Sequence, residues 1–196
     1  MTSTRPTTGA KINVSDRPAR ERVLDAYIDL LLDSGERAAT LEAVAERAEV
    51  SKGGLLYHFA SKSDLERGLL ERLDALMDED VHSLEGTALE TVENFLRTSN
   101  NAGTPLDRAL LATVRLAQGS EAAQQALHDV NQRWLTLLRN TVHDEDLART
   151  ILLISDGIYY GSALSQVPAA QQLAPTQRDM ESAIVVVRQL MQATEG

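Results

Sequence analysis

Apolar residues recur at helical spacing along almost the whole chain, and the strict alternation typical of half-buried strands is missing. The pattern predicts a first helix over residues 16–33, capped at its start by Ser15 or Asp16 and ended by Gly35. Two short helices follow over 41–48 and 52–59, and a long helix follows them. Sparse proline and few aromatic residues agree with this pattern, so we predict an all-α fold.

The rest of the pattern is also helical. The long helix covers about 64–81, and five more helices are expected at 89–98, 105–118, 121–142, 146–165 and 176–193. This gives about nine helices in all, separated by polar or Gly- and Pro-containing loops such as 167–175. We expect three parts: a flexible polar tail over 1–15, a three-helix domain over 16–63 and a larger helical domain over 64–196. The tail is expected to be disordered, with a DNA-reaching arm as the alternative.

The segment 40–65, TLEAVAERAEVSKGGLLYHFASKSDL, carries the most informative local pattern. Thr40 is a good N-cap for the first short helix, and Ser51 can cap the second after the interruption at Glu49 and Val50. Ser61 or Ser63 can cap the long helix that follows. Two short helices joined by such a turn form a helix-turn-helix unit, whose second helix enters the major groove of DNA.

The distribution of charge limits where DNA can bind. The chain has a formal net charge of −10, yet its first 62 residues hold nine Lys and Arg against nine Asp and Glu. The other residues hold ten basic against twenty acidic side chains, and all three lysines lie in the first part. An acidic protein repels phosphate through its own field, so a DNA-binding surface must be separated from the acidic remainder. Only the N-terminal third permits this separation.

The pattern continues beyond the helix pair in a way that points to one family. Thr40-Leu41-x-x-Val44-Ala45, Val50-Ser51-Lys52-Gly53, Tyr57-His58-Phe59 and Ser61-Lys62-x-Asp64-Leu65 resemble the DNA-binding domain of the TetR family of bacterial transcriptional repressors. The resemblance covers roughly residues 19–70. It implies a dimer that binds a palindromic operator and is released by a small-molecule inducer. Two departures stand out, because Glu49 replaces the glycine common in the turn and Tyr57 lies one residue late.

Nine residues of this segment are candidates for DNA contact. Lys52 and Lys62 can reach phosphate, and Lys52 also a guanine edge, although either can equally be a solvated surface lysine. Paired glycines weaken a short helix, which favours close approach of backbone to DNA or else a frayed helix. The predicted DNA-binding residues are Thr40, Ser51, Lys52, Gly53, Gly54, Leu55, Tyr57, His58 and Lys62, with Leu55 either packing in the core or contacting a base methyl group.

The resemblance also implies a ligand pocket and a dimer interface in the larger domain. An aromatic patch beside a carboxylate suits a flat, apolar or cationic ligand, with plain core packing as the alternative. The candidate pocket residues are Met77, Phe95, Arg115, Trp134, Leu138, Asp156, Tyr159 and Tyr160. The last two helices are expected to form the homodimer interface through Leu147, Ile151, Ile154, Ile158, Ile184, Val187, Leu190 and Met191, with small residues Gly157, Gly161, Ser162 and Ala163 permitting close approach.

Other classes of protein fit the sequence less well. Without cysteine there are no disulfides or thiolate zinc sites, and no apolar run is long enough to cross a membrane. A cytoplasmic protein without cofactors is expected. None of the four histidines lies in a metalloprotease or serine-base pattern, so we expect no enzyme. The acidic run 143–146 is expected to be an exposed loop, with metal binding as the alternative. A helical scaffold that binds a protein partner without recognising DNA is the alternative function.

Overall fold

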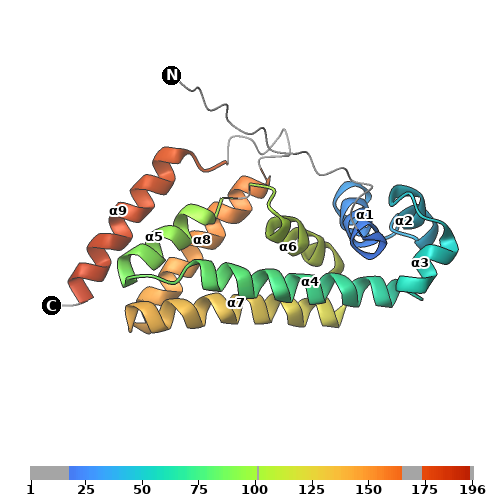
Figure 1. The fold of residues 1–196 in the computed structure, drawn as a ribbon. Coiled ribbons are helices and arrows are strands. Elements are labelled where there is room, and N and C mark those ends of the chain that lie inside the picture. The colour runs from blue at the N-terminus through green and yellow to red at the C-terminus, as the bar shows by residue number, and fades with distance from the viewer. Residues whose placement is uncertain (1–17, 101, 165–173, 195–196) are drawn as a thin grey trace, which may run out of the picture. The chain divides into compact units, whose positions relative to one another are not determined.

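The structure is a computed structural model that describes residues 18–100, 102–164 and 174–194. Within these ranges it contains nine α-helices and no strand, so the predicted all-α fold is confirmed (Figure 1). The chain forms two compact units, Met1–Gly68 and Leu69–Gly196. The division between these units falls five residues after the predicted boundary at residue 63. The predicted tail over 1–15 and most of the predicted loop 167–175 lie outside the described residues.

The helices begin and end within a few residues of the predicted positions. Their observed bounds are α1 Ala19–Ser34, α2 Leu41–Arg47, α3 Lys52–His58, α4 Lys62–Ser83, α5 Ala88–Thr98, α6 Pro105–Leu116, α7 Glu121–Val142, α8 Glu145–Leu164 and α9 Gln177–Thr194. The two longest helices, α4 and α7, have 22 residues each. Helix α4 starts in the N-terminal unit and continues into the C-terminal unit, so it is the covalent link between them.

The start of α1 differs from the prediction. The N-cap position is Pro18, with φ −52° and ψ 141°, and not Ser15 or Asp16. A proline disfavours helical backbone in the residue before it, which prevents the helix from starting earlier. At the other end, Gly35 has φ 79° and its N–H donates to the Leu31 carbonyl at 3.2 Å. This left-handed position needs glycine, and the predicted C-cap is confirmed.

The N-terminal unit is built on a filled apolar core. Helices α1, α2 and α3 pack together and contribute fully buried side chains that include Leu24, Leu31, Val44 and Leu55. Helix α4 joins this core through its first turns. A Cβ added at Gly68 would lie 2.8 Å from the Phe59 ring and 3.0 Å from Leu24, so only glycine lets α4 pack this closely. The N-terminal unit therefore extends to Gly68.

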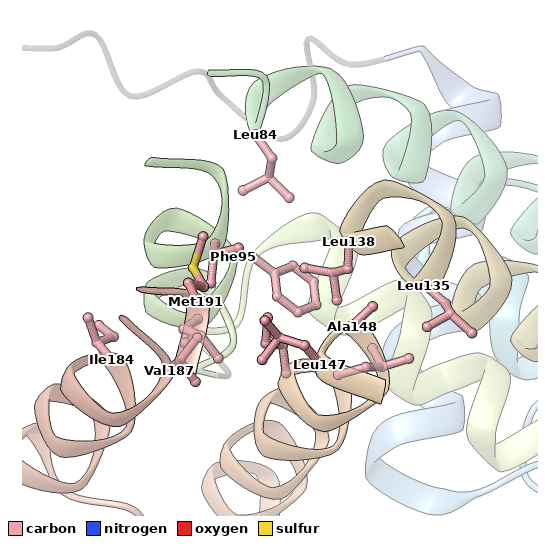
Figure 2. Packing of buried hydrophobic residues seen from close by; sticks show 13 residues of the cluster. Leu84, Phe95, Leu135, Leu138, Leu147, Ala148, Ile184, Val187 and Met191 are labelled. Atoms are coloured by element: carbon pink, nitrogen blue, oxygen red, sulfur yellow. The ribbon is translucent and has the colours of Figure 1, made fainter. Parts of the chain in front are cut away.

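The C-terminal unit has a second core in which four helices meet. Its buried cluster draws side chains from α5, α7, α8 and α9 that point toward one another in Figure 2, with Phe95 of α5 and Leu138 of α7 among them. The supporting helices have well-formed starts. Thr87 and Thr104 each form a reciprocal capping box, with Glu90 and Asp107 respectively.

This core corrects part of the dimer prediction. Six of the eight apolar side chains expected at a subunit interface are at most 7% exposed within one subunit, namely Leu147, Ile151, Ile158, Ile184, Val187 and Met191. They face the subunit's own helices, so they cannot form the contact with a second chain. Leu190, also one of the eight, is 40% exposed, and the other exposed large apolar side chains on the described parts of these two helices are Leu153, Tyr160, Val185 and Val186.

None of the helices that the structure describes combines the length and the apolar character that a bilayer-spanning helix needs.

Candidate nucleic-acid interface and inner cavity

Helices α2 and α3 have the capped geometry that the sequence predicts. The Thr40 hydroxyl oxygen accepts a hydrogen bond from Ala43 N at 3.2 Å, and the Ser51 hydroxyl oxygen accepts one from Gly54 N at 3.0 Å. Both N-caps are therefore confirmed. Each hydroxyl keeps its own proton and is exposed to solvent, so each remains able to donate to another acceptor, including a phosphate oxygen. Those phosphate contacts stay predictions.

The turn between the two helices contains a strained residue. Glu49 has φ 54°, in the left-handed region that non-glycine residues rarely adopt. This is the turn position where the sequence departs from the family's common glycine. The Glu49 side chain is exposed. The departure therefore has two physical consequences, a strained turn and a carboxylate at the helix-turn-helix surface.

Helix α3 presents two different faces. Leu55 is fully buried and the following Phe59 is 3% exposed, so both side chains pack in the core of the unit. Leu56 and Tyr57 are 38% and 85% exposed. The Leu55 contact with a base methyl group is therefore wrong, because its side chain points inward, and its alternative role in the core is confirmed. Tyr57 packs edge-on against the exposed His58 ring, with ring centroids 5.0 Å apart.

Lys52 stands at the start of α3 and is held by an acid of the preceding helix. Its Nζ donates to Glu42 Oε1 at 2.6 Å, and both side chains are more than half exposed. The hydrogen bond from Lys52 holds the pKa of the Glu42 carboxyl below its usual value. Exposed ion pairs contribute little net stability, so a phosphate can replace Glu42 at small cost. This ion pair keeps Lys52 on the outer surface of helices α2 and α3.

Lys62 has a different environment. Its Nζ donates to the backbone carbonyl of Glu36 at 2.8 Å and to the Glu36 carboxylate at 3.3 Å. These bonds tie the first turn of α4 to the loop after α1. Lys62 therefore has a structural role in the N-terminal unit, and its predicted phosphate contact requires it to share or exchange these bonds.

The two glycines of α3 lie in different surroundings. Gly53 is exposed, and an added Cβ would meet nothing within 4 Å. An added Cβ at Gly54 would lie 3.2 Å from the Ser51 hydroxyl oxygen, so glycine there protects the cap. The protein's own structure thus gives no steric reason for glycine at position 53. A reason outside the chain, such as close approach of DNA, remains for Gly53 alone.

In the C-terminal unit, four of the predicted ligand residues come together. Trp134, Asp156, Tyr159 and Tyr160 line one cavity of about 80 Å³ between α6, α7 and α8. A second hollow of about 40 Å³ adjoins it and shares Trp134 and Tyr159 with it, and Phe95 lines this second hollow. The rings are arranged edge to face, with centroids 6.1 Å apart for Phe95 and Trp134 and 5.5 Å apart for the two tyrosines.

The other three predicted ligand residues lie elsewhere. Arg115 is exposed on α6 and lines neither hollow, so the structure does not bring it together with the other candidates. Leu138 is fully buried in the apolar cluster of Figure 2 and reaches neither hollow. Met77 lines a separate hollow of about 110 Å³ that faces Val130 and Arg133. Helical spacing placed these three residues on plausible faces but could not tell a cavity wall from a core or a surface.

The sequence interpretation missed Asp80. Leu73, Met77 and Asp80 of α4 and Leu84 just after it follow at helical spacing, and the three leucine and methionine side chains are at most 2% exposed. A single carboxylate in an otherwise apolar stripe was the available signal. Trp134 Nε1 donates to Asp80 Oδ2 at 3.0 Å, and the carboxylate lines the smaller hollow. Burial raises the pKa of Asp80, the bond from Trp134 opposes this shift, and the nearby Asp107 charge adds to it.

A capped helix pair, with the outer face of its second helix polar and flanked by lysines, defines a helix-turn-helix DNA-binding protein. Comparison with known proteins identifies the family of this helix-turn-helix domain. Residues 23–67 match the family described as bacterial regulatory proteins, tetR family. The N-terminal part of the chain thus carries this family's DNA-binding domain, as residues 40–65 predict, and members of the family are non-enzymatic DNA-binding regulators.

Individual relatives agree with this identification. A Mycolicibacterium smegmatis HTH-type transcriptional repressor, KstR, is 40% identical over 68 residues, which are 33% of either chain. A Bacillus subtilis HTH-type transcriptional regulator, YvkB, is 39% identical over 56 residues, 29% of this chain and 30% of its own. These matches thus span about a third of each relative's length. A Streptomyces coelicolor TetR-family structure covers 89% of this chain and 98% of its own at 22% identity and a TM-score of 0.65, a likeness of fold.

Proposed function

We propose that this protein is a ligand-responsive transcriptional repressor that works in the cytoplasm and binds a palindromic DNA operator as a homodimer. The observation that carries the proposal is the polar outer face of α3, capped by Ser51 and bearing Lys52, on a unit whose core is otherwise closed. KstR, which matches this unit, is named as a repressor. An α-helix presented in this way fits the major groove.

The DNA contacts divide by chemistry. Lys52 can exchange Glu42 for a phosphate or for guanine O6 and N7, and the exposed Tyr57 and His58 can donate to phosphates. The hydroxyls of Thr40 and Ser51 and the amine of Lys62 are further donors. Gly53 allows the backbone of α3 to approach closely, while Gly54 protects the Ser51 cap. Leu55 supports the helix from inside and makes no contact with DNA.

A homodimer is needed because two recognition helices must reach successive major grooves. The face available for it is the exposed one on α8 and α9. Leu153 is 71% exposed, Gly157 and Tyr160 follow on the same side of α8, and a Cβ added at Gly157 would meet nothing within 4 Å. On α9, Val186 and Leu190 are 50% and 40% exposed and lie one turn apart. A small residue among exposed apolar ones lets a second copy's helix approach closely.

The inner cavity is proposed as the site where a small molecule acts. It lies in the C-terminal unit, and α4 connects that unit to the helix-turn-helix. A ligand that binds one arrangement of α4 better than another shifts the population by its differential affinity, typically by about 1–3 kcal/mol. Asp80 and its bond to Trp134 belong to α4 and α7, so the cavity and the connecting helix share a contact.

The test is binding of the purified protein to the DNA upstream of its own gene, by fluorescence anisotropy at two salt concentrations. The proposal predicts saturable binding of two chains per site, weaker at higher salt because lysines displace counterions from phosphate. A shuffled duplex of the same composition is the control. Equal and weak binding to both duplexes would favour a helical scaffold that recognises a protein partner and not DNA.

A further inference from the structure

The cavity between α6, α7 and α8 has an unusual charge balance for an enclosed space. The two hollows are lined by three carboxylates, those of Asp80, Asp107 and Asp156, and by no lysine, arginine or histidine. Within the described part of the chain, no ion pair joins any of the three to a cation. A charge that is partly removed from water without a cationic partner is costly, so a bound cation would stabilise these carboxylates.

The three carboxylates are not equally free. Asp107 Oδ2 accepts hydrogen bonds from the N–H and hydroxyl of Thr104 at 2.8 Å each, so this carboxylate is used to start α6. Asp80 accepts one bond from Trp134 Nε1. Asp156 is half-buried, and among the described residues no hydrogen bond or ion pair engages its carboxylate. Partial burial of this carboxyl raises the pKa of Asp156 above its ordinary value.

The walls beside these carboxylates are aromatic and apolar. Trp134, Tyr159 and Tyr160 line the larger hollow with Leu110 and Leu127. Aromatic ring faces attract cations, most strongly where water is excluded. The two adjoining hollows measure about 80 and 40 Å³, which together is less than an engineered cavity of about 150 Å³ that holds benzene. The space therefore suits a short aliphatic group with a single charged end and is too small for a benzene ring.

We propose that this cavity binds a small organic ammonium ion, with Asp156 and Asp80 as its counter-charges and Trp134, Tyr159 and Tyr160 as its aromatic wall. The inference rests on the proposed ligand response and names the class of ligand. The ammonium group lies against Asp156, and its apolar part fills the space beside Trp134. A cation that approaches Asp80 competes with Trp134 for the carboxylate on α4, and this gives the ligand a direct effect on the connecting helix.

The probe is propylammonium, compared with n-propanol, which has nearly the same shape and no charge. Trp134 is the only tryptophan in the chain, so its fluorescence reports the cavity directly in the full-length protein. We expect a saturable change with propylammonium and binding at least about tenfold weaker with n-propanol. Asp156→Asn should weaken propylammonium binding about tenfold and leave n-propanol unaffected. Asp146→Asn, an exposed acid on the same helix, is the matched control and should change neither.

Three results would overturn the inference: no saturable binding of propylammonium, equal affinity for the two probes, or loss of affinity in Asp146→Asn as large as in Asp156→Asn. Thermal unfolding of each variant shows whether it is folded. Operator binding of the same samples separates this inference from the proposed function. If DNA binds and propylammonium does not, the ligand class is wrong and the regulator remains; if no DNA binds, the proposed function fails whatever the fluorescence shows.

Discussion

In the N-terminal unit the polar side chains proposed to act stand outside a closed core, whereas in the C-terminal unit the carboxylates proposed to act lie inside. Lys52 of the first unit is more than half exposed and bonded to Glu42, a partner that water or phosphate can replace. Asp80 of the second is enclosed with Trp134 in an otherwise apolar stripe. An outer surface can recognise a large polyanion without rearrangement, while an inner site selects a small ligand by charge and size.

The largest effect is expected from a substitution that breaks the dimer and leaves both units folded. Gly157→Arg introduces a long cation on the exposed face of α8, where no atom of the subunit stands in its way. We expect a folded monomer and operator affinity lower by about 100-fold or more, because two linked half-sites are lost. Leu89→Arg, at an apolar residue of α5 that is 39% exposed, is the control and should remain dimeric. Sedimentation of both variants checks the assignment, and a dimeric Gly157→Arg contradicts it.

The next effect concerns the outer surface. Lys52→Ala should weaken operator binding about tenfold and lower the slope of log K against log salt by about one unit. Glu42→Gln should strengthen binding a few-fold, since it frees Lys52 and removes a negative charge. Glu46→Gln makes the same change of charge at an exposed position one turn further along α2. If both glutamine variants gain equally, general charge accounts for the effect and the Lys52–Glu42 pair does not.

A smaller effect is expected at Gly53, where one substitution should raise the stability of the protein and lower its affinity for the operator. Gly53→Ala should raise the free energy of unfolding by about 0.5–1 kcal/mol, because alanine favours the helix and its Cβ has open space. It should also reduce operator affinity several-fold if the backbone of α3 approaches DNA closely. Chemical denaturation and anisotropy measure the two quantities on one sample. A more stable protein with unchanged affinity would mean that DNA does not approach Gly53.

The smallest effect lies inside the C-terminal unit and depends on pH. Burial raises the pKa of Asp80 above its ordinary 3.8, so the folded state binds the proton more tightly than the unfolded chain. The cost of the buried charge is thus absent at low pH and grows as pH rises from the ordinary to the raised pKa. Asp80→Asn keeps an acceptor for Trp134 and should stabilise by about 1 kcal/mol at neutral pH, about 2–4 °C in melting temperature.

The gain in Asp80→Asn should fade as pH falls through the ordinary pKa of 3.8 and vanish well below it, where the wild-type carboxyl is protonated in both states. Glu79→Gln changes the same charge at an exposed neighbour on α4 and is the control. Differential scanning calorimetry across this range gives both profiles. A gain that persists at low pH would show that charge is not its cause.

The sequence predicted the N-terminal unit better than the cavity of the C-terminal unit, for physical reasons. Thr40, Ser51 and Gly35 act through contacts within a few residues, so their roles as caps could be predicted from their neighbours. Helical spacing also placed α7 at the predicted residues. Asp80 and Trp134 are 54 residues apart, and no local rule pairs them.

The dimer face shows the same limit. Spacing identified α8 and α9 as amphipathic but could not tell which apolar residues meet the subunit's own core. Ile151 and Val187 are buried there, while Leu153 and Val186 remain exposed. Side chains one or two positions apart on a helix point in different directions, so a small error in assigning the face exchanges core and surface.

The most direct test of the central claim is hydrogen–deuterium exchange of the full-length protein, free and bound to its operator. We predict that DNA slows exchange in residues 40–62 and most strongly at the start of α3, around Ser51 and Lys52. Protection confined to the C-terminal unit, with residues 40–62 unchanged, would show that DNA binds elsewhere and would contradict the assignment of the outer surface.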